Sequence, residues 1–224
     1  MDSQANILPV YFVADESGSM ASVIDKLNTG LVSLHDAMLK ESQAAAKVRM
    51  TILAFNDTTR CLMDLVDLRT LEMMPTLSPS GTTAYSAAFK DLRSRIESDV
   101  DRLKQQEFQV HRPAVFFLTD GVPNDNDPWK AALDELRSSS WTRRPNVLAF
   151  GVGSADARVV TEIASKPEFA FISPDGTDTG DAIAKFMESL TQSIVSSGQA
   201  LASGNAQLQV EPPKGFSLAV DLLP

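Results

Sequence analysis

Apolar residues along the chain follow two periods, one typical of buried strands and the other of amphipathic helices. Residues 7–14, with the sequence ILPVYFVA, form an unbroken apolar run, which is the pattern of a strand covered on both faces. After residue 19 the apolar positions recur every three or four residues, as on one face of a helix. These positions are Val23, Ile24, Leu27, Leu31, Leu34 and Met38. The chain is therefore predicted to begin with a strand followed by a helix.

The same succession of strand and helix repeats along the rest of the chain. Strand patterns cover residues 48–55, 60–68, 113–121, 145–153 and 169–173, and helix patterns cover residues near 84–105, 124–136, 155–165 and 180–197. The turn residues NDTT at 56–59 make the second and third strands an antiparallel hairpin. This alternation predicts an α/β fold: a doubly wound, mostly parallel six-stranded sheet with one antiparallel edge strand and helices on both faces.

One domain accounts for most of the chain. The sequence has 224 residues, of which 43% are hydrophobic, enough for one large core. Residues 1–197 are predicted to form this domain. The tail at 198–224 carries Gly, Ser and Pro with two short apolar stretches, so it adds an edge strand, covers the sheet or extends away from the domain.

Charge and cysteine content narrow the classes of function. The formal net charge is −9, with a pI of about 4.7, which disfavours binding to nucleic acids or anionic membranes. No apolar run approaches the length of about 18 residues that a membrane span needs. No basic residue precedes the first apolar run, as it would in a secretory signal peptide. The single cysteine, Cys61, excludes an internal disulfide and is predicted to be a small core residue. A soluble, cytoplasmic protein is expected.

Small oxygen-bearing side chains follow two of the predicted strands. Asp15, Ser17 and Ser19 come directly after the first strand, and Asp120 directly follows the apolar residues 113–119 at the end of the strand pattern 113–121. Ligands of open parallel sheets bind beyond the carboxyl ends of the strands, where the strand order reverses. If these two strands are neighbours, Asp15 and Asp120 face each other there. Gly18 is expected to let the first loop turn tightly, so that both serines aim at one point.

The side chains of these loops suit a hard cation. Together with Thr82 from the loop SGTT at 80–83, they offer carboxylate and hydroxyl oxygens, the ligands that Mg²⁺ and Mn²⁺ prefer. Zn²⁺ favours His and Cys ligands, but His35, His111 and Cys61 lie in other segments. One Mg²⁺ or Mn²⁺ ion is therefore the expected cofactor.

The motifs DESGS, GTT and LTDG together resemble the metal-ion-dependent adhesion site of von Willebrand factor type A domains. The resemblance covers about residues 7–197 and is most similar to stand-alone bacterial proteins of the TerY type, associated with tellurium resistance and stress. It implies that Ser17 and Ser19 bind the metal directly, that Thr82 is a mobile third ligand, and that Asp15 and Asp120 bind directly or through waters and hydroxyls. The family often has Gly-Gly-Thr where this chain has Ser-Gly-Thr-Thr, so Thr83 is an alternative ligand or caps the next helix.

The resemblance also implies a function. The metal keeps one coordination position open for an Asp or Glu of a protein partner, so the chain is expected to be a binding module and not an enzyme. A kinase or a phosphatase is the kind of partner that the TerY-type setting implies, in a stress-response or tellurium-resistance complex. The alternative is a metal-dependent hydrolase or phosphatase on the same sheet. An aspartyl-phosphate enzyme, however, needs a second acid where this chain has Ser17, and a serine hydrolase needs Gly-x-Ser-x-Gly and a histidine.

Residues around the predicted site have simpler interpretations. Glu16 is expected to face solvent. The sequence NDND at 124–127 favours a turn in which Asp127 is the N-cap of the next helix and Pro128 its first residue. Tyr85 and Trp129 are interpreted as half-buried packing residues, with exposed anchors for a partner as the alternative.

Overall fold

Strands and helices alternate along the computed structural model, which describes residues 5–222. The strands are β1 (Asn6–Asp15), β2 (Val48–Phe55), β3 (Thr59–Val66), β4 (Gln109–Val110), β5 (Ala114–Thr119), β6 (Asn146–Gly151), β7 (Ala170–Ile172) and β8 (Ser217–Leu218). The helices are α1 (Ile24–Lys40), α2 (Ser42–Ala45), α3 (Tyr85–Gln105), α4 (Trp129–Arg137), α5 (Ala157–Ile163) and α6 (Thr179–Ala202). Among the residues described, no helix combines the length and apolar character that a membrane span requires.

All strands belong to one sheet, with the order β3-β2-β1-β5-β6-β7-β8 and β4 paired to β1. The strands from β2 to β7 in this order are parallel, whereas β3 pairs antiparallel with β2. The predicted fold class is therefore confirmed, including the 48–66 hairpin. Two strands of two residues each, β4 and β8, extend the six predicted strands, and β8 runs antiparallel to β7 at the far edge.

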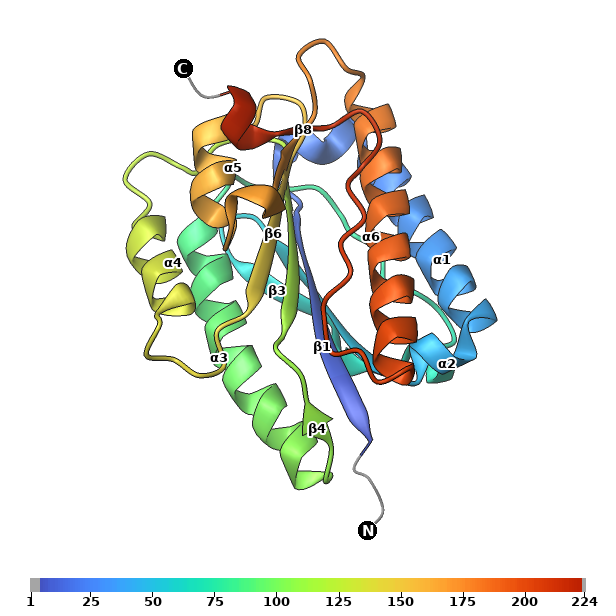
Figure 1. The fold of residues 1–224 in the computed structure, drawn as a ribbon. Coiled ribbons are helices and arrows are strands. Elements are labelled where there is room, and N and C mark those ends of the chain that lie inside the picture. The colour runs from blue at the N-terminus through green and yellow to red at the C-terminus, as the bar shows by residue number, and fades with distance from the viewer. Residues whose placement is uncertain (1–4, 223–224) are drawn as a thin grey trace.

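Two hydrophobic cores cover the two faces of the sheet. Helices α1, α2 and α6 lie on one face and α3, α4 and α5 on the other (Figure 1). Alternate side chains of β1 separate into these cores: Phe12 packs with the α1 and α6 side, whereas Tyr11 and Val13 pack with the α3 side. Burial on both faces explains why β1 reads as a continuous apolar run and not as an alternating one.

The chain after α6 packs back onto this helix. Figure 1 shows the segment running alongside α6 before it reaches β8. Ser189 and Ser193, one turn apart on α6, hydrogen-bond the backbone C=O and N–H of Glu211, at 2.5 and 3.0 Å. Of the three outcomes foreseen for the tail, the described part adds the edge strand β8, and the segment before this strand packs on α6, which was not foreseen. Helix α6 itself continues to Ala202, and the domain boundary at 197 remains a prediction.

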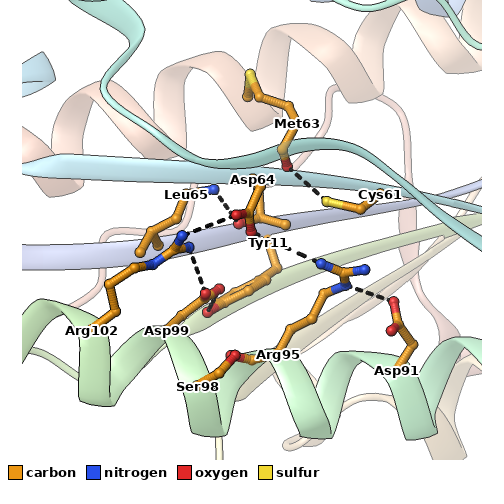
Figure 2. Close-up of polar contacts among 11 residues, drawn as sticks. Tyr11, Cys61, Met63, Asp64, Leu65, Asp91, Arg95, Ser98, Asp99 and Arg102 are labelled. Atoms are coloured by element: carbon orange, nitrogen blue, oxygen red, sulfur yellow. Dashed lines mark hydrogen bonds and ion pairs between the residues drawn. The ribbon is translucent and has the colours of Figure 1, made fainter.

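A polar network lies between the sheet and α3. The buried Tyr11 hydroxyl donates to Asp99 at 2.9 Å, and Arg102 bridges Asp99 and Asp64 at 2.8 and 3.0 Å (Figure 2). Burial is the main cause that raises the pKa of both Tyr11 and Asp99. The arrangement satisfies a buried carboxylate and joins α3 to the edge strand β3. Cys61 on β3 is half-buried, more exposed than the core position predicted for it.

Candidate metal site

The candidate site lies where β1 and β5 are neighbours in the sheet. These strands pair in parallel, with Ala14 opposite Leu118, so Asp15 and Asp120 follow at the same edge. The chain leaves β1 toward β2 on one side and leaves β5 toward β6 on the other, which makes this the point where strand order reverses. The expected neighbourhood of the two strands is confirmed.

Hydrogen bonds link four of the five predicted site residues. The backbone N–H of Ser17 donates to Asp15 Oδ1 at 2.9 Å, the Ser17 and Ser19 Oγ atoms lie 3.0 Å apart, and Ser19 Oγ donates to Asp120 Oδ1 at 2.8 Å. A hydroxyl has one proton to donate. Because Ser19 donates its proton to Asp120, Ser19 is the acceptor and Ser17 the donor in the contact between the two serines. Each serine oxygen then retains at least one lone pair for a cation.

The two carboxylates are buried without a counter-charge. Asp15 is fully buried and Asp120 is 6% exposed, and no ion pair from residues 5–222 reaches either of them. Burial raises the pKa of Asp15 to about 6 and also raises the pKa of Asp120, because a charged group loses its hydration there. Asp15 is partly compensated by the Thr119 hydroxyl, which donates to Oδ2 at 2.7 Å. A bound cation would supply the missing positive charge.

Thr82 lies in a loop held against the first loop, but its hydroxyl has other partners. The Gly18 N–H donates to Gly81 O at 3.1 Å, which joins the two loops. The Thr82 hydroxyl donates to Asp57, and Asn124 Nδ2 donates to Thr82 Oγ1 at 2.8 Å. The structure therefore brings Thr82 to the edge of the site without a hydrogen bond to the serines or to Asp15 and Asp120.

A protein-family model for the von Willebrand factor type A domain matches residues 10–188. The chain belongs to this family. The matched range spans β1 to α6 and includes all five predicted site residues. Among curated proteins, none matches the sequence.

Solved structures share the type A fold at low sequence identity. Proximal thread matrix protein 1 from the mussel byssus, described with a zinc-occupied MIDAS motif, has a TM-score of 0.60 and 12% identity over 85% of this chain and 48% of its own. The pilus adhesin SpaC from Lactobacillus rhamnosus GG has a TM-score of 0.66 and 14% identity over 86% and 31%. Manganese-loaded TRAP protein from Plasmodium vivax has a TM-score of 0.51 and 20% identity over 80% and 71%. This chain thus spans about half of the mussel protein and a third of SpaC.

The residues of this type A domain fit a hard divalent cation. Two buried carboxylates and the free lone pairs of Ser17 and Ser19 form an oxygen-only set, which is what Mg²⁺ and Mn²⁺ prefer. Within the described chain, no cluster of three or more His, Cys, Asp or Glu side chains could hold a metal, so any ion here needs the hydroxyls. The assignment of Asp15, Ser17, Ser19, Thr82 and Asp120 as ligands remains a prediction.

Thr83 has a different environment from Thr82. It is buried, its N–H donates to Asn124 Oδ1 at 3.0 Å, and its C=O accepts from the Asn124 N–H at 2.9 Å. Thr82, in contrast, is exposed. The geometry favours Thr82 as the hydroxyl nearer to solvent and to a partner.

Glu16 was expected to face solvent, and this expectation is wrong. Its side chain is completely buried, and its two oxygens accept from Arg60 on β3 at 2.9 and 2.8 Å. The Ser78 N–H adds a longer contact at 3.4 Å. The carboxylate therefore ties the loop between Asp15 and Ser17 to the edge of the sheet.

Four neighbouring expectations, for Tyr85, Asp127, Pro128 and Trp129, also need correction. Tyr85 and Trp129 are both buried, with ring centroids 6.0 Å apart, so neither is half-exposed or available to a partner. Helix α4 begins at Trp129 with Pro128 as its N-cap. Asp127 instead accepts from the Ser86 N–H at 3.0 Å and so caps α3 from a distant loop.

Gly81, and not Gly18, is the glycine that the loop geometry requires. Gly81 has φ +71° and a Cβ there would overlap the Asp57 carboxylate, whereas a Cβ on Gly18 would lie 3.5 Å from Gly81 O, an ordinary contact. Gly81→Ala should therefore lower the free energy of unfolding by about 1–2 kcal/mol, and Gly18→Ala by less than about 0.5 kcal/mol. Urea denaturation of both variants measures this difference, and an equal or larger loss for Gly18→Ala would contradict the assignment.

Proposed function

We propose that this chain is a metal-dependent protein-interaction module. One Mg²⁺ or Mn²⁺ ion is held by Ser17, Ser19 and Thr82, with Asp15 and Asp120 binding directly or through waters. The observation that carries the proposal is the pair of buried carboxylates for which residues 5–222 supply no cationic partner, beside hydroxyls that keep free lone pairs. A buried carboxylate is costly unless it is paired or coordinates a metal.

The partner is proposed to supply an Asp or Glu side chain. Such an ion retains an open coordination position when neutral hydroxyls form much of its ligand set, and a carboxylate is the natural hard ligand to fill it. Two structural neighbours with the same fold support binding of a divalent metal, since their descriptions name a zinc-occupied MIDAS motif and a manganese-loaded protein.

Binding is favoured over hydrolysis by the positions of the histidines. The chain has two. His35 Nε2 hydrogen-bonds Leu68 O at 2.9 Å, and the backbone N–H of His111 donates to Ile7 O near the start of β1, which places His111 at the opposite end of that strand from Asp15. Neither supplies a general base to Ser17 or Ser19, as a serine nucleophile would need.

The finer biological setting rests on the sequence resemblance. We propose a cytoplasmic stress-response or tellurium-resistance complex, with a kinase or a phosphatase as the partner. The proposed metal ligands do not depend on this setting. The setting would be refuted if the protein that supplies the carboxylate proved to be neither a kinase nor a phosphatase.

Replacement of one serine tests the ligand assignment. Ser19 is exposed and lies outside the core, but its hydroxyl donates to the buried Asp120, so Ser19→Ala should keep the fold and lower the free energy of unfolding without metal by about 1 kcal/mol. Mn²⁺ affinity, measured by calorimetry, should fall by about 10-fold or more, because even partners behind the ligands contribute 10–100-fold. Ser33→Ala on the exposed side of α1 is the matched control and should bind like the wild type. Unchanged affinity in Ser19→Ala would refute the proposed site.

A further inference from the structure

The turn between β2 and β3 holds the loop that carries Thr82. The Ala84 N–H donates to Asn56 O at 2.8 Å, and Asn56 Nδ2 donates to Ser80 Oγ at 3.0 Å. Asp57, the next residue of the turn, contacts Thr82 between these two anchor points. The turn therefore contacts the threonine loop at several points from Ser80 to Ala84, although the contacting residues are 24 or more positions apart in the sequence.

One oxygen of Asp57 accepts two hydrogen bonds from Thr82. Oδ1 receives the Thr82 N–H at 3.2 Å and also the Thr82 hydroxyl proton. Gly81 leaves room for this contact, because a Cβ at that residue would overlap Asp57 Oδ2. Gly81 thus provides the space for the Asp57 carboxylate, and Thr82 provides the two donors that hydrogen-bond it.

The contacts of Thr82 decide what its oxygen can still do. A hydroxyl has one proton and two lone pairs. The proton goes to Asp57, and one lone pair accepts from Asn124 Nδ2 at 2.8 Å, so one lone pair remains. A hydroxyl can bind a cation only when its proton points elsewhere, and Asp57 accepts that proton.

We propose that Asp57 is a positioning residue of the metal site, which selects Thr82 over Thr83 as the third hydroxyl ligand. The inference rests on the proposed function, and it extends the site to a residue in the turn NDTT. Asp57 acts by accepting the Thr82 hydrogen bonds, and not by ligating the ion or by its charge. Partners of this kind, which orient a ligand from behind, typically contribute 10–100-fold to metal affinity.

Three variants separate hydrogen bonding from charge and from loop anchoring. Asp57→Ala removes the acceptor and should weaken Mn²⁺ binding by about 10-fold. Asp57→Asn keeps an oxygen acceptor without the charge and should stay within about 3-fold of the wild type, since a neutral oxygen still receives the proton. Ser80→Ala removes a different side-chain contact between the same turn and the same loop, and should leave affinity unchanged. All three affinities are measured by calorimetry with Mn²⁺ on the full chain.

A double-mutant cycle identifies the residue through which Asp57 acts. In a Thr82→Ala background, Asp57→Ala should cause no further loss of affinity, whereas in a Thr83→Ala background it should retain its full effect. Equal losses in Asp57→Asn and Asp57→Ala would overturn the proposal, because they would make Asp57 a ligand or a charge partner. Unchanged affinity in Asp57→Ala, with a loss in Ser19→Ala, would overturn it while the proposed function stands. Unchanged affinity in Ser19→Ala would instead refute the proposed function, and the inference with it.

Discussion

Replacing Asp120 with asparagine should abolish metal binding without destabilising the metal-free protein. Asp120 is 6% exposed and its Oδ1 accepts from Ser19 at 2.8 Å, a bond that an asparagine oxygen can retain. The substitution removes a negative charge that has no ion-pair partner among the described residues. Because burial disfavours that charge and raises the pKa of the Asp120 carboxyl, the neutral side chain should be tolerated as well or better when no cation is present.

Thermal unfolding with and without Mn²⁺ measures both halves of this result. An ion that binds only the folded state stabilises it by about 2.7 kcal/mol when its concentration is 100 times the dissociation constant. The Tm of the wild type should rise on addition of Mn²⁺ because of this stabilisation, and the Tm of Asp120→Asn should not change. Asp125→Asn is the matched control, since Asp125 is exposed in the same loop. A metal-dependent shift that survives in Asp120→Asn, or a marked loss of stability without metal, would contradict the assignment.

Features of the sequence that depend on local pattern were predicted well. The apolar run of β1 and the three- and four-residue spacing of α1 each reflect burial that repeats along one element. The turn NDTT defined a hairpin, and parallel strands brought Asp15 and Asp120 to one edge of the sheet. These inferences needed only periodicity and the rule that ligands bind where strand order reverses.

Features that depend on contacts between distant segments could not be read from the sequence. Glu16 lies in a polar loop, and only the pairing with Arg60, 44 residues away, makes its burial tolerable. Asp57 and Asn124 occur in NDTT and NDND, which look like ordinary turn residues. Their contacts with Thr82 exist because the sheet order places both turns beside the threonine loop. Gly81 before Thr82 was the available sign that another group packs closely against this loop. It did not indicate that the Asp57 side chain fills the space beside Gly81.

Removing Arg60 should destabilise the domain more than its position at the surface suggests. The Arg60 side chain is 49% exposed, but the Glu16 side chain that it binds is completely buried. Arg60→Ala removes both Arg60 hydrogen bonds and leaves the Glu16 side chain with the longer contact to the Ser78 N–H at 3.4 Å. An unsatisfied buried charged group costs more than a neutral one, so we expect the free energy of unfolding to fall by about 2 kcal/mol, which is less than for a fully buried pair.

A second substitution shows whether the buried charge causes this loss. Glu16→Gln removes the charge, so the double variant Arg60→Ala with Glu16→Gln should recover part of the stability that Arg60→Ala loses, as measured by urea denaturation at pH 7. Lys130→Ala is the control, because its pair with Glu162 is exposed on both sides, at 66% and 46%, and such pairs contribute at most about 1 kcal/mol. If Arg60→Ala behaves like Lys130→Ala, the loop must open to hydrate Glu16. The burial of Glu16 would then not be what holds the loop between Asp15 and Ser17 in place.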